Sequence, residues 1–206
     1  MNKKFSVLIK NKITKFNKTI LVANDKSISH RALLIASQCI GPSNLKGVLE
    51  SEDVKNTIIC LKKLGVKILK KNKKYIVYGN GLRSFRKPHK NLLYVGNSGT
   101  LARLLIALIT THPNLKVKVF GDSSLNKRDM KRIIEPLSKI GCNFYPKGKT
   151  TLPLIIEGTS MPLAQKHSET LGSAQVKSAI LLAAINTRGT TTVEEKKYPG
   201  IIPKIF

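Results

Sequence analysis

One arrangement of residues occurs three times along the chain: small polar residues stand directly ahead of an apolar, helix-forming segment. The three copies read SISHRALLIASQC (27–39), NSGTLARLLIALI (97–109) and GSAQVKSAILLAAI (172–185). Copies spaced by about seventy residues indicate a repeated supersecondary unit, which cannot bury its apolar face alone. We therefore expect pseudo-symmetric packing in which three helix N-termini converge. Ser and Gly are also ordinary capping residues, and capping alone explains any single copy.

The first unit is predicted from its apolar periodicity and its turn residues. Gly65 stands where a helix C-cap is expected. The predicted elements are a strand at 19–23, a helix at 27–39, a strand at 44–49, a helix at 53–64 and two strands at 66–69 and 75–78. This order is a βαβαββ unit.

The second unit repeats this order, and the third begins it. LGVKI (64–68) matches IGCNF (140–144), with Gly141 in the place of Gly65. The second unit is predicted to contain strands at 92–95, 115–120 and 154–156 and helices from 97 and at 127–140, and the third a helix from 172 and a strand at 190–194. The expected fold class is α/β (α+β): one pseudo-threefold domain with units at about 23–80, 90–158 and 165–206, the last incomplete.

The first helix start has the composition of an anion site. Asp25 is placed to cap the helix, which leaves free N–H groups and the positive end of the dipole beside Lys26 and Ser27. Arg31 lies four residues after Ser27 and shares its face. A capped amphipathic helix with two solvated cations explains the same residues.

The net charge of +26 fits nucleic acid, an anionic membrane surface or small anionic substrates. The lysines are scattered through turns and strand edges with few aromatic residues between them, so we interpret most of the charge as solvated surface and expect no specific nucleic-acid partner. The longest apolar runs, 104–110 and 179–185, are too short to cross a membrane.

Cysteine and histidine usage indicates no metal site, and the histidines do not require a catalytic role. The three cysteines, Cys39, Cys60 and Cys142, lack metal-ligand spacing and favour a reducing cytoplasm. His30 is expected to orient its surroundings locally. The other three histidines are expected in loop-like surroundings without triad or metal spacing; they are His89, His112 and His167.

Several strings together resemble the 5-enolpyruvylshikimate-3-phosphate synthase (EPSP synthase) family over about residues 20–194. They are DKSISHRALL (25–34), EDVKNTI with LGV (52–66), GNSGTLARLL (96–105), GDSSLNKR with IEPL (121–137) and GSAQVKSAILLA (172–183). Any one of them is weak evidence. Their order and spacing together are specific.

The resemblance implies two domains of three βαβαββ units each, with substrates in the cleft between them. Residues 23–206 would form the first domain, and residues 1–22 a strand segment that packs with the second. The implied reaction transfers the enolpyruvyl group of phosphoenolpyruvate to the 5-hydroxyl of shikimate 3-phosphate and releases phosphate. No metal or organic cofactor is implied, and the missing second domain is needed for a complete site.

The resemblance also assigns site residues. Lys26 would lie between the two substrates as a candidate proton-transfer group. Shikimate 3-phosphate would contact Lys26, Ser27, Arg31, Ser173, Ala174 and Gln175, and phosphoenolpyruvate would contact Lys26, Gly99, Arg128 and Gln175. Asn97 and Arg103 are weaker candidates, for which a structural cap and a solvated cation are equally good interpretations. Gly99 is also expected to leave room for phosphoenolpyruvate mimics such as glyphosate.

This chain departs from the family at three places. Ala23-Asn24 stands where the family has Pro-Gly, and Asp129, where it has proline, is expected to weaken the anion contact of Arg128. After Glu195 the family continues in a pattern like PSRDHTE, whereas this chain ends YPGIIPKIF (198–206). These residues can be encoded as TAT CCA GGG ATC ATA CCG AAA ATA TTT, which read two bases later gives SRDHTENI.

We therefore expect a frameshift, in the gene or from sequencing, near Lys196 or Lys197, which resequencing of the locus tests. The chain is accordingly expected to be inactive alone and to expose apolar faces. Two alternatives stay open: an enolpyruvyl transferase acting on a nucleotide sugar, and a basic nucleic-acid-binding module.

Overall fold

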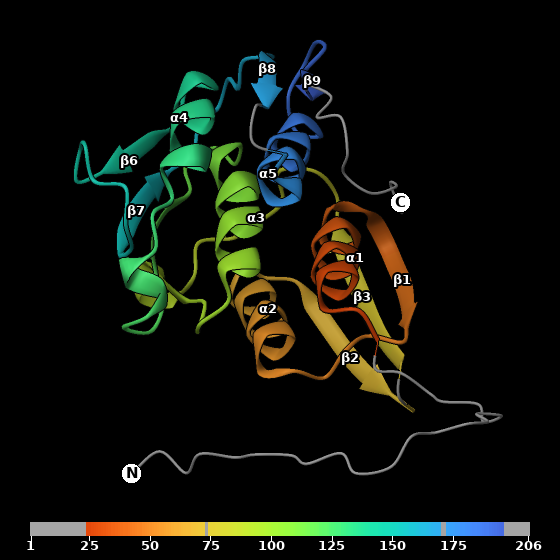
Figure 1. The fold of residues 1–206 in the computed structure, drawn as a ribbon. Coiled ribbons are helices and arrows are strands. Elements are labelled where there is room, and N and C mark those ends of the chain that lie inside the picture. The colour runs from red at the N-terminus through yellow and green to blue at the C-terminus, as the bar shows by residue number, and fades with distance from the viewer. Residues whose placement is uncertain (1–23, 73, 170–171, 196–206) are drawn as a thin grey trace, which may run out of the picture.

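The computed structural model describes residues 24–72, 74–169 and 172–195 (Figure 1). The strand expected at 19–23 and the expected frameshift near Lys196 lie outside these residues. In chain order the elements are α1 (Lys26–Gln38), β1 (Ile40–Lys46), α2 (Glu52–Lys63), β2 (Lys67–Lys71), β3 (Lys74–Asn80), a 3-10 turn (His89–Asn91), β4 (Leu92–Tyr94), α3 (Gly99–Thr110), β5 (Lys116–Phe120), a 3-10 turn (Leu125–Lys127), α4 (Lys131–Lys139), β6 (Asn143–Tyr145), β7 (Leu154–Glu157), β8 (Lys166–Glu169), α5 (Ala174–Ala184) and β9 (Thr192–Glu195).

The first helix of each unit begins in the same way, as the three sequence copies predict. The Asp25 carboxylate accepts the N–H of Ile28 at the start of α1. The hydroxyls of Ser98 and Ser173 likewise accept an N–H three residues later, in α3 and α5. Each cap satisfies one of the backbone donors that a helix start leaves free, and fixes where the helix begins.

The sheets repeat as well. In the second unit the strand order is β4-β5-β7-β6, with β4 and β5 parallel and the remaining neighbours antiparallel. The first unit has the corresponding order β1-β3-β2, in which both pairs are antiparallel. In the third, β8 and β9 pair in parallel like β4 and β5. The predicted α/β fold of repeated units is therefore confirmed.

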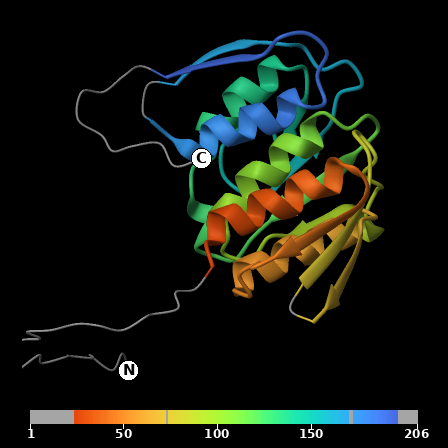
Figure 2. The same ribbon diagram turned by 90° about the vertical axis from the view of Figure 1, so that its right-hand side faces the viewer.

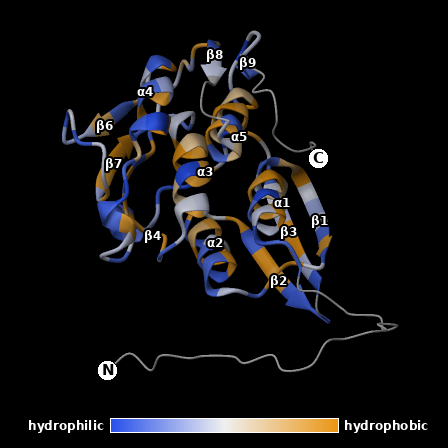
Figure 3. Cartoon of the chain, in the orientation of Figure 1, coloured by the Kyte–Doolittle hydropathy of each residue, from blue (hydrophilic) through white to orange (hydrophobic). Residues whose placement is uncertain are grey.

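The core lies between the helices, with the sheets outside them. Figures 1 and 2 show α1, α3 and α5 running side by side. Except for Arg103, every residue of α3 is buried, and five leucines and isoleucines from 104 to 109 have no exposed surface. Burying such a side chain stabilises the fold by about 1.5–3 kcal/mol. In Figure 3, apolar residues recur along α1, α3 and α5.

Two element boundaries differ by several residues from the predictions, and one strand was missed. The strand expected at 44–49 is β1, which pairs with β3 from Ile40 to Lys46; Gly41 and Pro42 hid this start in the sequence pattern. The helix expected at 127–140 begins only at Lys131, because Arg128 has an extended backbone after the 3-10 turn. Strand β8 was not predicted.

Exposed apolar side chains are present on α1 and α5, as expected for an incomplete third unit. Ile35 on α1 and Leu181 on α5 are each about half exposed, and Ile28 and Ile185, one or two turns away, are exposed as well. The two helices are neighbours, since Asn186, just after α5, donates to Gln38 at the end of α1.

We expect this surface to cause self-association of the purified chain. Changing Ile35 and Leu181 together to lysine should increase the monomer fraction in sedimentation velocity, because exposed apolar patches drive association. Leu82→Lys, at an exposed leucine outside these two helices, serves as control. A monomeric wild-type chain at the same concentration would contradict the prediction.

Candidate functional site

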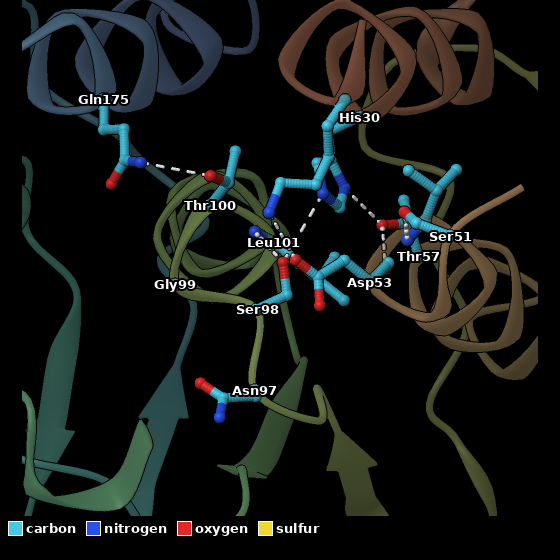
Figure 4. A network of polar contacts seen from close by, with 12 residues as sticks. His30, Ser51, Asp53, Thr57, Asn97, Ser98, Gly99, Thr100, Leu101 and Gln175 are labelled. Carbon is cyan, nitrogen blue, oxygen red and sulfur yellow. Dashed lines mark hydrogen bonds and ion pairs between the residues drawn. The ribbon is translucent and has the colours of Figure 1, made fainter. Parts of the chain in front are cut away.

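The first turns of α1, α3 and α5 meet around a cavity of about 380 Å³. Its lining combines polar and cationic side chains from five separate segments, some of which are drawn in Figure 4. The lining residues are Lys26, Asp53, Asn97, Gly99, Thr100, Arg103, Arg128 and Gln175. The convergence of helix starts predicted from the repeats is therefore present.

Positive charge dominates this cavity. Three of its lining side chains are cationic, Lys26, Arg103 and Arg128, against the one carboxylate of Asp53. Burial, together with the neighbouring Arg128 and Arg132, lowers the pKa of Arg103 below its ordinary value. The N-terminus of α3 adds free N–H groups and the positive end of its dipole. This arrangement suits a small polyanion.

Lys26 is held by an acidic residue that the sequence reasoning missed. Its Nζ lies 2.8 Å from Oδ2 of Asp53, in the first turn of α2, and the lysine side chain is half exposed. Pairs this exposed contribute only about 0–1 kcal/mol, so an anionic ligand can compete for the lysine. The available signal was the EDV string at the start of α2, although acidic residues in that position usually serve the helix dipole.

Arg128 reaches the cavity from the loop before α4. Its Nη2 donates to Oδ1 of Asn97 at 2.8 Å, which orients the guanidinium and leaves its other donors for a ligand. A Cβ at Gly99 would lie 2.8 Å from Nη1 of Arg103 and 3.4 Å from Nη1 of Arg128. Glycine at this position therefore leaves the space that the two guanidinium groups occupy.

Gln175 joins the start of α5 to α3. Its Oε1 accepts from Nη1 of Arg103 at 2.8 Å, and its Nε2 donates to the hydroxyl of Thr100 at 3.0 Å (Figure 4). Both ends of the amide are engaged, so its orientation is defined. Thr100, which is buried, was not singled out from the sequence.

The remaining residues expected to contact shikimate 3-phosphate lie beside this cavity rather than on it. Nε and Nη2 of Arg31 donate to the Ser178 hydroxyl at 3.1 and 2.8 Å, and Nη1 donates to the Ser27 carbonyl. Arg31 thereby joins α1 to α5 through Ser178, another residue that the sequence reasoning missed. Ser173 lines a neighbouring cavity of about 210 Å³ that shares Arg103 and Gln175 with the first. Ala174 is exposed in the first turn of α5.

The Asp129 carboxylate points to α4. It accepts the backbone N–H of Lys131 at 2.9 Å, and this bond, together with the Thr150 hydroxyl, lowers the pKa of Asp129. The carboxylate thus bonds the backbone two residues on, as in an Asx turn that leads into α4. This bond does not involve Arg128, and the expected weakening of Arg128 by this carboxylate stays a prediction.

Two histidines are fully buried. His30 has no exposed surface and contacts α2 and α3, and its expected role in orienting its surroundings stays a prediction. His112 follows α3 in a turn but is fully buried, stacked on Phe85 with ring centroids 4.4 Å apart. Within the described residues there is no helix long and apolar enough for a membrane span, and no cluster of three or more metal-ligating side chains.

Comparison with known proteins identifies the family of the chain. The model of the family described as EPSP synthase (3-phosphoshikimate 1-carboxyvinyltransferase) matches residues 10–202. The 3-phosphoshikimate 1-carboxyvinyltransferase of Paramagnetospirillum magneticum is 42% identical over 177 residues, covering 85% of this chain and 39% of that protein. The enzyme of the same name from Streptococcus uberis is 44% identical over 178 residues, covering 86% and 41%.

A solved structure of EPSP synthase from Acinetobacter baumannii superposes with a TM-score of 0.81 at 34% identity, covering 90% of this chain and 41% of that one. The chain thus spans about two fifths of the length of the curated relatives it matches.

Proposed function

This chain belongs to the EPSP synthase family, and from that premise we propose that it supplies one half of a site for enolpyruvyl transfer. In the proposed reaction the enolpyruvyl group of phosphoenolpyruvate passes to the 5-hydroxyl of shikimate 3-phosphate, and phosphate is released. Residues 23–206 are proposed to form the first of two domains. A second domain, supplied by additional sequence, completes the cleft.

One observation carries the proposal. Lys26, Gly99, Arg128 and Gln175, the four residues expected to contact phosphoenolpyruvate, come from four separate segments and line one cationic cavity. Binding of nucleic acid by a basic surface does not require these four residues to line one cavity. The curated relatives named above favour the shikimate enzyme over a transferase acting on a nucleotide sugar.

The chemistry assigns a role to each group. Protonation of the enol of phosphoenolpyruvate builds positive charge on the carbon that the 5-hydroxyl attacks. The phosphate and carboxylate of phosphoenolpyruvate must be held in position during this step. Arg128 presents a planar fork to an anionic group of phosphoenolpyruvate, and the N-terminus of α3 presents N–H groups to another. Lys26, beside Asp53, is the proposed proton-transfer group between the substrates.

Shikimate 3-phosphate is proposed to bind at the adjoining starts of α1 and α5. Ser27 and Arg31 lie on α1, and Ser173, Ala174 and Gln175 at the start of α5. The Arg31 contacts to Ser178 hold these two helix starts together before a ligand arrives, which lowers the entropy lost on binding. The three free cysteines support the proposal that the protein works in the reducing cytoplasm.

Titration of the chain with phosphoenolpyruvate, followed by line broadening of the ligand's phosphorus resonance, tests this function. Lys26→Ala should weaken binding by about fivefold to tenfold, because the anion loses one cation whose own partner, Asp53, then stands unpaired in the cavity.

Lys63→Ala, which removes an exposed lysine in the last turn of α2, should leave the binding unchanged. The proposal is wrong if phosphoenolpyruvate does not bind, or if it binds both variants equally. Steep salt-dependent affinity for RNA together with either result would favour the nucleic-acid-binding alternative.

A further inference from the structure

His30 is a buried imidazole at the meeting point of three helices, and the proposed chemistry does not use it. It lies on α1; its Nδ1 is 2.6 Å from Oγ1 of Thr57 on α2, and its Nε2 is 3.4 Å from Oγ of Ser98, the cap of α3 (Figure 4). Both hydroxyl residues are buried. One side chain therefore links the helix that carries Asp53 to the residue that sets the start of α3.

Counting donors favours one position for the imidazole proton. The Thr57 hydroxyl lies 3.3 Å from the Asp53 carbonyl oxygen, and when it donates its hydrogen there, its own oxygen accepts from Nδ1 of His30. A neutral imidazole has a single N–H, so Nε2 is an acceptor and receives the hydroxyl hydrogen of Ser98. The Ser98 oxygen is then free to accept the N–H of Leu101. Every polar atom in this chain of contacts is satisfied.

The surroundings disfavour a charged imidazole. Burial, the largest cause, lowers the pKa of His30 together with Lys26 and Arg31, and against the opposing effect of Asp53 the pKa comes to about 4. A second proton, placed on Nε2, would face the Ser98 hydroxyl and deprive it of its acceptor. The neutral form is therefore the form that matches the surrounding helices.

We propose that His30, as a neutral imidazole protonated on Nδ1, is a positioning residue that holds the anion-binding start of α3 against α1 and α2. It acts through Ser98, whose cap defines the orientation of the Gly99 and Thr100 N–H groups, and through Thr57, one turn after Asp53. This role rests on the proposed function, in which the start of α3 binds an anion.

The first test needs no variant. Long-range proton–nitrogen correlation spectra of the wild-type chain at neutral pH should show His30 with a protonated Nδ1 and an unprotonated Nε2. Acidification should leave this signature in place until the pH approaches the lowered pKa. The Nε2–H tautomer, or an imidazolium at neutral pH, overturns the proposal even if every variant fails to fold.

The second test compares two variants in which an amide replaces one or the other ring nitrogen of His30. Glutamine places an amide near the Nε2 position and can keep the Ser98 contact, whereas asparagine reaches only the Nδ1 position and loses it. With sulfate as probe, which stays a dianion over the pH range used, His30→Gln should bind within about twofold of the wild type and His30→Asn about tenfold more weakly. His112→Gln, at a buried histidine outside the cavity, controls for the loss of a buried ring.

The outcomes separate this inference from the proposed function. If the wild-type chain binds sulfate but not phosphoenolpyruvate, the proposed function is rejected and the comparison of His30 variants with sulfate is still valid. Equal sulfate affinity of the asparagine and glutamine variants rejects the positioning role while the function stands. Failure of both anions to bind the wild type overturns both.

Discussion

Arg128→Gln should weaken phosphoenolpyruvate binding by about 10-fold to 100-fold. Hydrogen bonds between charged groups contribute about 1.5–3 kcal/mol, and a planar guanidinium donates two of them in parallel to one anionic group. Glutamine can still donate to Oδ1 of Asn97, the present partner of Arg128, so the loop before α4 keeps that contact. The substitution therefore removes only hydrogen bonds to phosphoenolpyruvate. With less ligand bound, the phosphorus resonance of phosphoenolpyruvate should be narrower than with the wild-type chain.

Two further variants decide whether the affinity for phosphoenolpyruvate depends on the paired donors of the Arg128 guanidinium or on its charge alone. Arg128→Lys keeps the charge without the planar pair of donors, and should recover only a part of the affinity. Arg188→Gln removes an exposed arginine beyond α5 and controls for the lower net charge of the chain. An affinity that falls equally in Arg128→Gln and Arg188→Gln would mean that the anion responds to overall charge, and the assigned contact would be wrong.

The helix starts were predictable because their chemistry is local. Asp25, Ser98 and Ser173 each bond a backbone N–H three residues away, so a short string contains both partners. The repeated strings then imply that the three starts meet, since equivalent units pack in equivalent ways. This is why the starts of α1 and α5, distant in sequence, were expected in one place, whereas the assignment of Lys26 and Gln175 to one site came from the family resemblance.

The residues that the prediction missed have partners far away in the sequence. Asp53 is 27 residues from Lys26, and Ser178 is 147 residues from Arg31. A carboxylate in a first helical turn and a serine within a helix both have common local explanations. His30 is the extreme case, because its two ring nitrogens contact two other helices, and no string around it contains either partner.

Two glycines that hold strands against helix ends were also missed, although they recur in both complete units. A Cβ on Gly79, in β3, would lie 2.2 Å from the Cys39 carbonyl oxygen just after α1. A Cβ on Gly158, directly after β7, would lie 2.1 Å from the His112 carbonyl oxygen just after α3. Both contacts are with backbone, which cannot rotate away as a side chain does.

We expect Gly79→Ala and Gly158→Ala each to lower the free energy of unfolding by about 2–4 kcal/mol, since helix and strand must separate to admit the methyl group. For a chain of this size the midpoint of thermal unfolding should fall by roughly 5–15 °C, measured by circular dichroism. Gly148→Ala is the control: a Cβ there meets nothing within 4 Å, and its φ of +79° costs only about 1 kcal/mol. If Gly79→Ala and Gly158→Ala unfold at midpoints no lower than that of Gly148→Ala, helix and strand do not approach as closely as described. The described packing of both units would then be wrong.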